Sequence, residues 1–373
     1  MGGYVQTAEL INDQIWQPHH FLQPIGFPLI LHLVKARIFE WGMALSLAHA
    51  LLSFASLVLM WRLTEEWFGF KAGIVALALG SIHLPWIYLT NYALPETAFT
   101  FLLSAGAWVA GRIVKSGPTP RKLSFLWGIL FAGALWLKGT HIFLLPLFAC
   151  GLLVLHRRKS ATAIAALAVS VGAGLALHGV LTYSKIGVVR LTATGGGLNF
   201  LEGKCPEKRN FDSLGYSALS PLYYQLDLVA EKRWGRPFTD AGYFWRQGLK
   251  CIAKDPFVLV QSFESIPYLF LGNTIWPLNV RPESGKIRLY ELFFTAFLLC
   301  GLTIRLHDGL RAYSLAEFLV WGVPIVSLFA CAYVFKSEAR YRVPFDFWLI
   351  PLATVGWISL FERATIQEES STR

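Results

Sequence analysis

The stretch RRKSATAIAALAVSVGAGLALHGVL, residues 157–181, decides the fold class of this chain. It begins with consecutive cations and then runs from Ala161 to Leu181 without Asp, Glu, Lys or Arg. A helix needs about 20 apolar residues to cross a membrane, where its backbone polar groups find partners only inside the helix. Since Lys and Arg in short loops mark the cytoplasmic side, the stretch predicts a spanning helix that starts at the cytoplasmic face.

The same alternation of apolar runs and short charged clusters extends over most of the chain. The 373 residues are 55% hydrophobic and only 15% charged, whereas a soluble domain carries roughly 25% charged residues. We therefore expect an all-α polytopic membrane protein. The predicted spans are Ile38–Trp61, Ala72–Leu89, Glu96–Val114, Leu123–Leu137, Ile142–His156, Ala161–Leu181, Leu289–Ile304, Leu315–Phe335 and Pro344–Leu360.

The distribution of charge predicts which loops lie on which side. The basic segments Arg112–Lys122, Arg157–Lys159 and Arg305–Arg311 fall on one side when the spans alternate, and the positive-inside rule makes that side the cytoplasm. Topology therefore explains the net charge of +10 better than nucleic-acid binding does. The segments expected on the outer side are Tyr4–Lys35, Thr90–Pro95, Lys138–His141, Thr182–Arg288 and Lys336–Val343.

The large outer region contains one further apolar stretch, Pro256–Trp276, which follows Asp255. If this stretch crossed the membrane, the basic segment Arg305–Arg311 would move to the outer side. We therefore expect an interfacial helix there. The predicted organisation is an outer first loop with a short amphipathic helix at 1–37, a membrane bundle at 38–181, an outer region at 182–288, membrane helices at 289–361 and a cytoplasmic tail at 362–373.

The first outer segment predicts a further membrane span upstream of it. Tyr4–Lys35 lacks the basic start and the apolar core of a signal peptide. Because a segment on the outer side needs a helix to carry it across, we expect one further span upstream of Met1.

The cysteines show no metal-ligand spacing. Cys150, Cys300 and Cys331 fall in apolar segments, which is typical of inert packing. Cys205 and Cys251 both fall in the large outer region, where a disulfide between them is one open interpretation.

Two outer turns carry candidate site residues. Glu96 opens an apolar span directly after Pro95. An acid in the first turn of a helix complements the helix dipole, so a structural role and a catalytic role are both open. Lys138 and His141 occupy a short turn between two spans, and they are interpreted either as an ordinary polar turn or, for Lys138, as a cation beside a phosphate.

Arg340 and Arg342 flank Tyr341 at the outer boundary of the last predicted span. Arginines at a membrane boundary serve as anchors that extend to the interface. Their planar guanidinium groups also match phosphate oxygens. Both interpretations are open from the residues alone.

A glycine-rich stretch, GGGLNFLEG at 195–203, lies in the large outer region and includes Asn199 and Glu202. Glycines permit a close approach of the backbone to another group. No Gly-Lys-Ser/Thr follows, so the stretch is not a nucleotide phosphate loop. It is interpreted either as a plain surface loop or as a closely approached binding loop.

Four blocks together carry a family resemblance. They are GY at 3–4 with PIGFPL at 24–29, LPE at 94–96, GGGLNFLEG at 195–203 and EARYRVP at 338–344. Their order, and their shared outer side, resembles the GT-C fold glycosyltransferases that use polyprenyl-phosphate sugars. The closest resemblance is to the bacterial branch near the protein O-mannosyltransferases and the lipid A aminoarabinose transferase.

The resemblance implies a GT-C-like helical bundle with an outer loop region, in a bacterial plasma membrane and with its active face outside the cytoplasm. It implies transfer of a sugar from a polyprenyl-phosphate donor to a lipid, glycan or protein acceptor by inverting direct displacement. Glu96 would be the catalytic base, and a divalent metal ion could neutralise the leaving phosphate. The implied substrate contacts are Tyr4, Lys138, His141, Asn199, Glu202, Arg340, Tyr341 and Arg342.

The chain departs from the family pattern at one point. Family members carry an acidic residue shortly before the tyrosine that matches Tyr4, whereas Gly2 and Gly3 precede it here. An inactive or truncated relative is therefore the first alternative. A multi-pass transporter is the second, although transporters usually contain internal repeats and none is found in this sequence.

Overall fold

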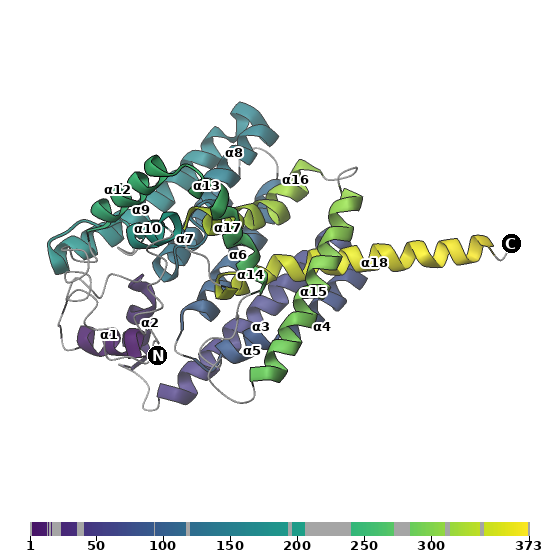
Figure 1. Cartoon of the computed structure of the whole chain (residues 1–373), viewed down its shortest axis with the longest axis horizontal. Helices are drawn as coiled ribbons and strands as arrows, with labels where there is room; N and C mark the ends of the chain where they lie inside the picture. Colours follow the sequence, from purple (N-terminus) through teal and green to yellow (C-terminus); the bar gives the residue numbers. More distant parts are fainter. Residues whose placement is uncertain are drawn as a thin grey trace.

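The computed structural model describes residues 2–12, 14, 16, 24–35, 41–92, 94–116, 120–192, 196–205, 240–271, 284–309, 314–335 and 339–371. Within these ranges all regular secondary structure is helical (Figure 1). The predicted all-α class is confirmed. The end of the predicted interfacial helix, at Trp276, and Glu338 of the fourth block lie outside the described residues.

Among the described residues, six helical segments are long and apolar enough to cross a membrane. They include α3 (Trp41–Phe68), α6 (Glu96–Lys115), α9 (Ala161–Ile186), α15 (Ser284–Gly309) and α18 (Asp346–Ser371). The sixth joins α16 (Leu315–Glu317), the π-helical turn η8 (Phe318–Gly322) and α17 (Val323–Val334). The prediction of a multi-pass membrane protein is confirmed by these segments.

Shorter helices complete the bundle. They are α4 (Phe70–Ser81), α5 (Leu84–Leu89), α7 (Arg121–Leu137) and α8 (Leu144–His156). Helix α3 packs on α4 and α6, while α7 packs on α6 and α9. Helices α15 and α18 cross at a point where only glycine fits, because a Cβ at Gly356 would lie 2.0 Å from the carbonyl oxygen of Gly301.

The single span predicted at Ala72–Leu89 was wrong, because the helix breaks between α4 and α5. Pro85 stands in the first turn of α5, where its missing N–H costs nothing but where it prevents a continuous helix. The Tyr290 hydroxyl donates to the Ile82 carbonyl at 2.9 Å and accepts from the Leu84 N–H at 3.5 Å. These bonds satisfy backbone groups that the break releases, and the break brings His83 into the interior.

Two other predicted boundaries also change. The last helix continues past Leu360 to Ser371 and projects from the bundle (Figure 1). Its end is rich in residues of good helix propensity, such as glutamate and alanine. The predicted interfacial helix begins at Val258, after the Asp255 carboxylate accepts a hydrogen bond from the Phe257 N–H at 3.0 Å. Its described part consists of α13 (Val258–Gln261), η6 (Ser262–Glu264) and α14 (Ser265–Leu271).

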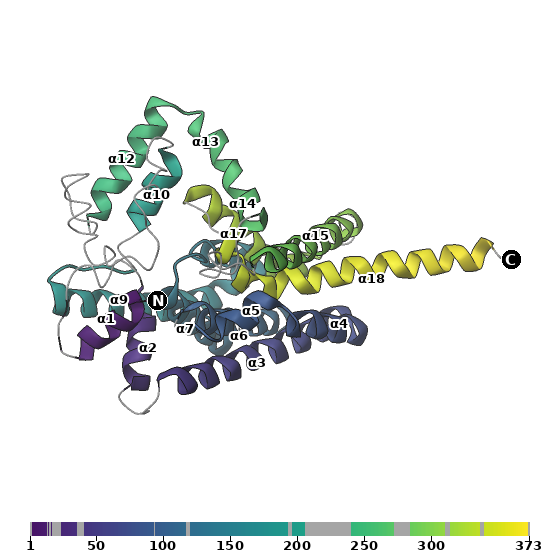
Figure 2. The same ribbon diagram turned by 60° about the horizontal axis from the view of Figure 1, so that its bottom comes forward.

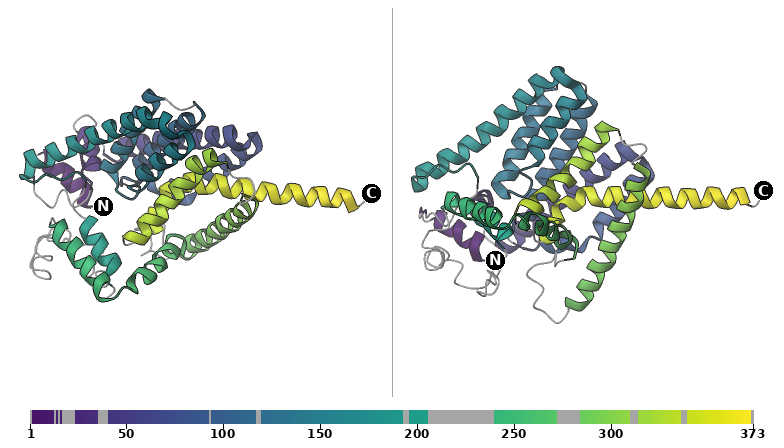
Figure 3. Two further views of the ribbon diagram at one scale, coloured as in Figure 1. Left: turned by 90° about the horizontal axis from the view of Figure 1, so that it is seen from above. Right: turned by 45° about the horizontal axis from the view of Figure 1, so that its top comes forward.

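Two helical groups cover one end of the bundle (Figures 2 and 3). The first is α1 (Gly2–Asn12) packed on α2 (Gly26–Lys35). Helix α2 reaches the bundle through Gly26, where a Cβ would lie 2.6 Å from the Trp136 carbonyl oxygen of α7. The expected short helix in the first outer segment is therefore present as α1. Helix α2 was not predicted, because its ten residues are too few to cross a membrane.

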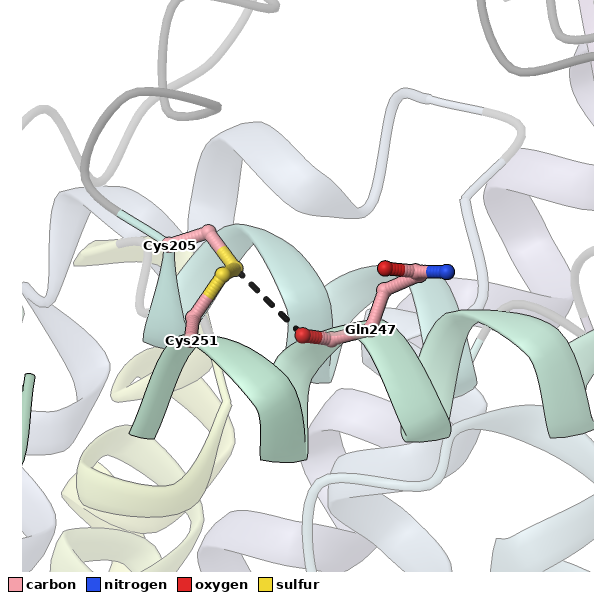
Figure 4. Close-up of a disulfide and its surroundings, with 3 residues drawn as sticks. All are labelled: Cys205, Gln247 and Cys251. Atoms are coloured by element: carbon pink, nitrogen blue, oxygen red, sulfur yellow. Dashed lines mark hydrogen bonds between the residues drawn. A yellow bond between two sulfur atoms is a disulfide. The ribbon is translucent and has the colours of Figure 1, made fainter. Parts of the chain in front are cut away.

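The second group joins α10 (Gly196–Lys204) to α12 (Ala241–Lys254). A disulfide links Cys205 to Cys251, with Cα atoms 5.6 Å apart (Figure 4). The Cys205 sulfur also lies 3.9 Å from the Gln247 carbonyl oxygen. The disulfide that the cysteine pattern left open is therefore present in the structure.

Candidate functional site

Glu96 is the first residue of α6, and its side chain is buried. Pro95 caps the helix, and its carbonyl accepts from the Phe99 N–H at 2.8 Å. Glu96 is 2% exposed, and its Oε1 accepts a hydrogen bond from Lys138 Nζ at 3.0 Å. A buried carboxylate needs such a partner, because removal of a charge from water is costly.

Lys138 follows the last residue of α7 and has an extended backbone conformation. Its Nζ lies 4.8 Å from the centroid of the Tyr341 ring. The Arg340 guanidinium lies 5.9 Å from the same centroid, and its charge acts on Glu96. Residues from three separate segments therefore form what we call the Glu96 cluster, defined as Glu96, Lys138, Arg340 and Tyr341.

The Glu96 cluster combines a paired carboxylate with an open acceptor. Glu96 Oε2 is buried and has no hydrogen-bond partner among the described residues. Lys138 is 12% exposed, and Arg340 and Tyr341 are half-buried. The cluster can therefore accept a proton at Oε2 while it presents two cations to an anion.

A small cavity lined by apolar residues lies deeper between α6, α7, α8 and α17. Leu103 of α6, Phe131 of α7 and Trp348 of α18 are among its lining residues. Leu103 stands about two helical turns below Glu96 on the same helix.

Arg342, two residues after Arg340, is buried in a different environment. Its Nε lies 3.1 Å from Asp346 Oδ1, and its Nη1 donates to Thr295 Oγ1 at 3.2 Å. Asp346 Oδ2 in turn lies 3.1 Å from His83 Nε2. We call His83, Thr295, Arg342 and Asp346 the His83 cluster.

Sequence reasoning missed His83 and Asp346. Burial lowers the pKa of His83, an effect that the Asp346 carboxylate opposes. Asp346 follows Arg342 by one helical turn, and that spacing is a sequence signal for an ion pair. No comparable signal existed for His83, because it lay inside a predicted continuous span.

His141 is also fully buried. Its ring packs edge-on against Phe131 and obliquely on Phe99, and Nε2 lies 3.3 Å from the Phe131 carbonyl oxygen. Burial lowers the pKa of His141 to about 4. The imidazole is therefore neutral at pH 7, and it packs against Phe99, which follows Glu96 by three residues on α6.

Tyr4 packs edge-on against Phe27 of α2, with ring centroids 5.4 Å apart. In α10, Asn199 is exposed and Glu202 is buried. Helix α10 packs on α12 and α17. Neither Asn199 nor Glu202 belongs to the Glu96 cluster. The neighbouring Lys204 is buried and donates to Ser262 Oγ and to the Tyr333 carbonyl oxygen, both at 2.6 Å.

The described residues offer no donor set for a protein-held metal. Across the described ranges, no group of three or more His, Cys, Asp or Glu side chains is arranged to hold a metal ion. The Glu96 cluster supplies one carboxylate and two cations, a set that does not suit a divalent cation. We therefore assign no residue to a metal.

Comparisons with known proteins give limited similarity. No protein-family model matches this chain. No curated protein matches it. ArnT from Cupriavidus metallidurans bound to undecaprenyl phosphate is similar at a TM-score of 0.36 and 14% identity, and the apo state of ArnT at 0.37 and 15%. Each alignment covers 95% of this chain and 72% of ArnT. At these TM-scores the similarity assigns neither a reaction nor a residue to this chain.

Proposed function

We propose that this chain is a membrane glycosyltransferase. It transfers a sugar from a polyprenyl-phosphate donor to a hydroxyl or amine of a lipid, glycan or protein acceptor. The observation that carries the proposal is the Glu96 cluster. Residues from two of the four sequence blocks meet there with Lys138 around one buried carboxylate.

The cluster supplies the groups that inverting displacement requires. Glu96 Oε2 takes the acceptor proton while the acceptor oxygen or nitrogen attacks the anomeric carbon of the sugar. The bond between that carbon and the phosphate oxygen breaks, and the lipid phosphate leaves with the bonding electrons. A positioned general base contributes about 10²–10⁴-fold to such a step.

Lys138 and Arg340 fit the leaving phosphate. Lys138 has three N–H donors, so it can hold Glu96 Oε1 and a phosphate oxygen at once. The Arg340 guanidinium suits two phosphate oxygens together. The Tyr341 ring lies against both cations.

Other predicted residues take supporting roles in this proposal. Arg342, which is paired with Asp346, holds the segment that carries Arg340. His141 supports the start of α6 through Phe99. Tyr4, Asn199 and Glu202 contact the sugar or the acceptor.

The proposed active face is outside the cytoplasm of a bacterial plasma membrane. The basic loops support this orientation through the positive-inside rule. The disulfide between Cys205 and Cys251 supports it independently, because disulfides persist in oxidising compartments and are rare in the cytosol.

The test is covalent transfer in sealed membranes that contain the chain and a radiolabelled polyprenyl-phosphate sugar. We expect label in a lipid, glycan or protein fraction with the wild type and none with Glu96→Gln. Glu362→Gln, which changes an exposed glutamate of α18, is the matched control. Uptake of free sugar without covalent transfer would favour a transporter, and a folded wild type without either activity would favour an inactive relative.

A further inference from the structure

Helix α12 has three faces of different chemical character. Phe244 and Gly248 form a buried face, where a Cβ at Gly248 would lie 2.6 Å from the ring of Phe200 in α10. Trp245 and Leu249, which are also four residues apart, form an exposed apolar face with 37% and 55% of each residue accessible. The third face is basic. Packing on α10 therefore uses one face of the helix and leaves two exposed.

Three exposed cations form the basic face of α12. Arg246, Lys250 and Lys254 follow one another at intervals of four residues, so they lie in one row along the helix. The helix itself contains no Asp or Glu, and none of the three cations is paired with a carboxylate of the described residues. The flanking acids, Asp240 and Asp255, accept hydrogen bonds from backbone N–H groups. Since like charges at this spacing destabilise a helix, the row favours an anionic partner.

Contacts with α17 place α12 at the level where that span ends. The Trp245 ring lies 5.9 Å from the ring of Phe335, the residue that follows α17. Lys204, at the end of α10 beside the disulfide, is buried and donates to the carbonyl of Tyr333 in the last turn of α17. Helix α12 runs across the direction of α18 in Figure 2. The helix therefore lies along the membrane boundary, where tryptophan is enriched.

The segment after α12 descends from this level along α17. Phe263 of η6 contacts Tyr333, with ring centroids 4.8 Å apart, and Phe270 of α14 contacts Phe329, with centroids 6.2 Å apart. Phe329 stands one helical turn before Tyr333, so α14 lies deeper than η6. The Phe270 carbonyl also accepts a hydrogen bond from Thr295 Oγ1 at 3.4 Å, within the candidate span of α15. The large apolar side chains exposed along this segment are Phe257, Leu259, Val260, Phe263, Tyr268 and Leu271.

We propose that α12 lies in the headgroup layer of the membrane and binds anionic phospholipids. Trp245 and Leu249 insert beside the acyl chains, while Arg246, Lys250 and Lys254 contact the lipid phosphates. An apolar face next to a basic face is the pattern of a helix that lies in the interface. The lipid-exposed segment that follows α12 keeps the helix at that depth. This surface is separate from the Glu96 cluster, and its role does not depend on the proposed function.

The test is photo-crosslinking from position 249 in nanodiscs of dioleoyl phosphatidylcholine with dioleoyl phosphatidylglycerol as the minor lipid. The photoreactive residue p-benzoylphenylalanine replaces Leu249 in the full chain, and mass spectrometry counts the adducts of each lipid. Because both lipids carry the same acyl chains, the adduct ratio reports selection of the headgroup. We expect the ratio of phosphatidylglycerol to phosphatidylcholine adducts to exceed that of the bilayer by about three- to tenfold.

Two changes should abolish this enrichment. The first removes the basic row through Arg246→Gln, Lys250→Gln and Lys254→Gln together. Its matched control removes three exposed cations of α4 and α7 and lowers the net charge equally, through Lys71→Gln, Arg121→Gln and Lys122→Gln. The control should keep the enrichment. The second change is salt at about 1 M, which screens exposed charges beyond about 3 Å and should reduce the enrichment several-fold without any substitution in the row.

Each result supports or overturns the proposal. Lipid adducts at the bilayer ratio, or an equal loss of enrichment in the two triple variants, would overturn selection of anionic headgroups. Adducts to a second copy of the chain, or an absence of lipid adducts, would overturn the interfacial position of α12. A chain that transfers no sugar but shows the expected enrichment would refute the proposed function and leave this surface assigned.

Discussion

The Glu96 cluster and the His83 cluster are both buried groups of opposite charges, but they differ in how fully the carboxylate is enclosed by basic groups. In the Glu96 cluster one carboxylate oxygen is paired with Lys138, the other has no partner among the described residues, and the second cation is half-buried. In the His83 cluster each Asp346 oxygen lies 3.1 Å from a basic group, and the three charged or titratable side chains are at most 2% exposed.

This difference separates the candidate site from a structural ion pair. A carboxylate with an open oxygen and nearby cations can act on a ligand. The Asp346 carboxylate is fully buried between Arg342 and His83, so a ligand has no access to it, although its loss would leave a buried charge unpaired. The segment from Arg340 to Asp346 belongs to both clusters, so the ion pair fixes the position of the site.

The largest expected effect is on activity at Glu96. Glu96→Gln removes the proton acceptor but keeps a side chain of the same shape, so we expect the rate of sugar transfer to fall by about 10²–10⁴-fold. The thermal midpoint in detergent should change little. If Glu96→Gln transfers sugar at the rate of the Glu362→Gln control, the Glu96 cluster is not the site of transfer.

The next effect is on stability at Asp346. Asp346→Ala leaves Arg342 buried without its carboxylate, which should cost roughly 3–5 kcal/mol. The measurement is the yield and the thermal midpoint of monodisperse protein. The double variant Asp346→Leu with Arg342→Met, which removes both charges, should recover part of the loss; a double variant less stable than the single one would contradict a purely supporting role.

The third effect is a pH dependence of stability that arises from two buried histidines, His141 and His83. The folded pKa of His141 is about 4, whereas an exposed histidine titrates near 6.5. The unfolded chain therefore binds the proton first, and stability falls as the pH drops from about 6.5 to 4, by roughly 3 kcal/mol in all. His83 should contribute in the same direction and less strongly, since Asp346 opposes the effect of burial.

The variants His141→Phe and His83→Phe resolve these contributions. Unfolding midpoints measured at several pH values should show a flatter acid side in His141→Phe than in the wild type. An unchanged pH profile in His141→Phe would mean that this imidazole does not titrate as its burial requires.

The smallest expected effect is on donor affinity at Arg340. Arg340→Ala should raise the KM for the polyprenyl-phosphate sugar by about 10- to 100-fold, in keeping with the roughly 1.5–3 kcal/mol of a charge-assisted hydrogen bond. Arg363→Ala, an exposed arginine on α18, is the control. If Arg340→Ala lowers the thermal midpoint as strongly as Asp346→Ala does, Arg340 belongs with the structural ion pair.

Much of the site could be predicted from local sequence. Glu96, Lys138, Arg340 and Tyr341 were each placed at an outer membrane boundary, and they meet in one cluster. Apolar length and the bias of basic loops are properties of short segments, so they were sufficient to bring these residues to one end of the bundle. The same local properties could not reveal α2, which is too short to span, or the break at His83.

The sequence by itself determined that the chain is helical, that it has several segments long and apolar enough to cross a membrane, and that the turns at Glu96, Lys138 and Arg340 lie at one end of the bundle, because each of these follows from the length and charge of contiguous segments. Only the tertiary structure decided that Arg340 joins Glu96 while Arg342 joins Asp346 and His83, and that Cys205 and Cys251 are bonded. These outcomes depend on the directions of side chains between helices that are distant in the sequence, and the packing of those helices sets the directions.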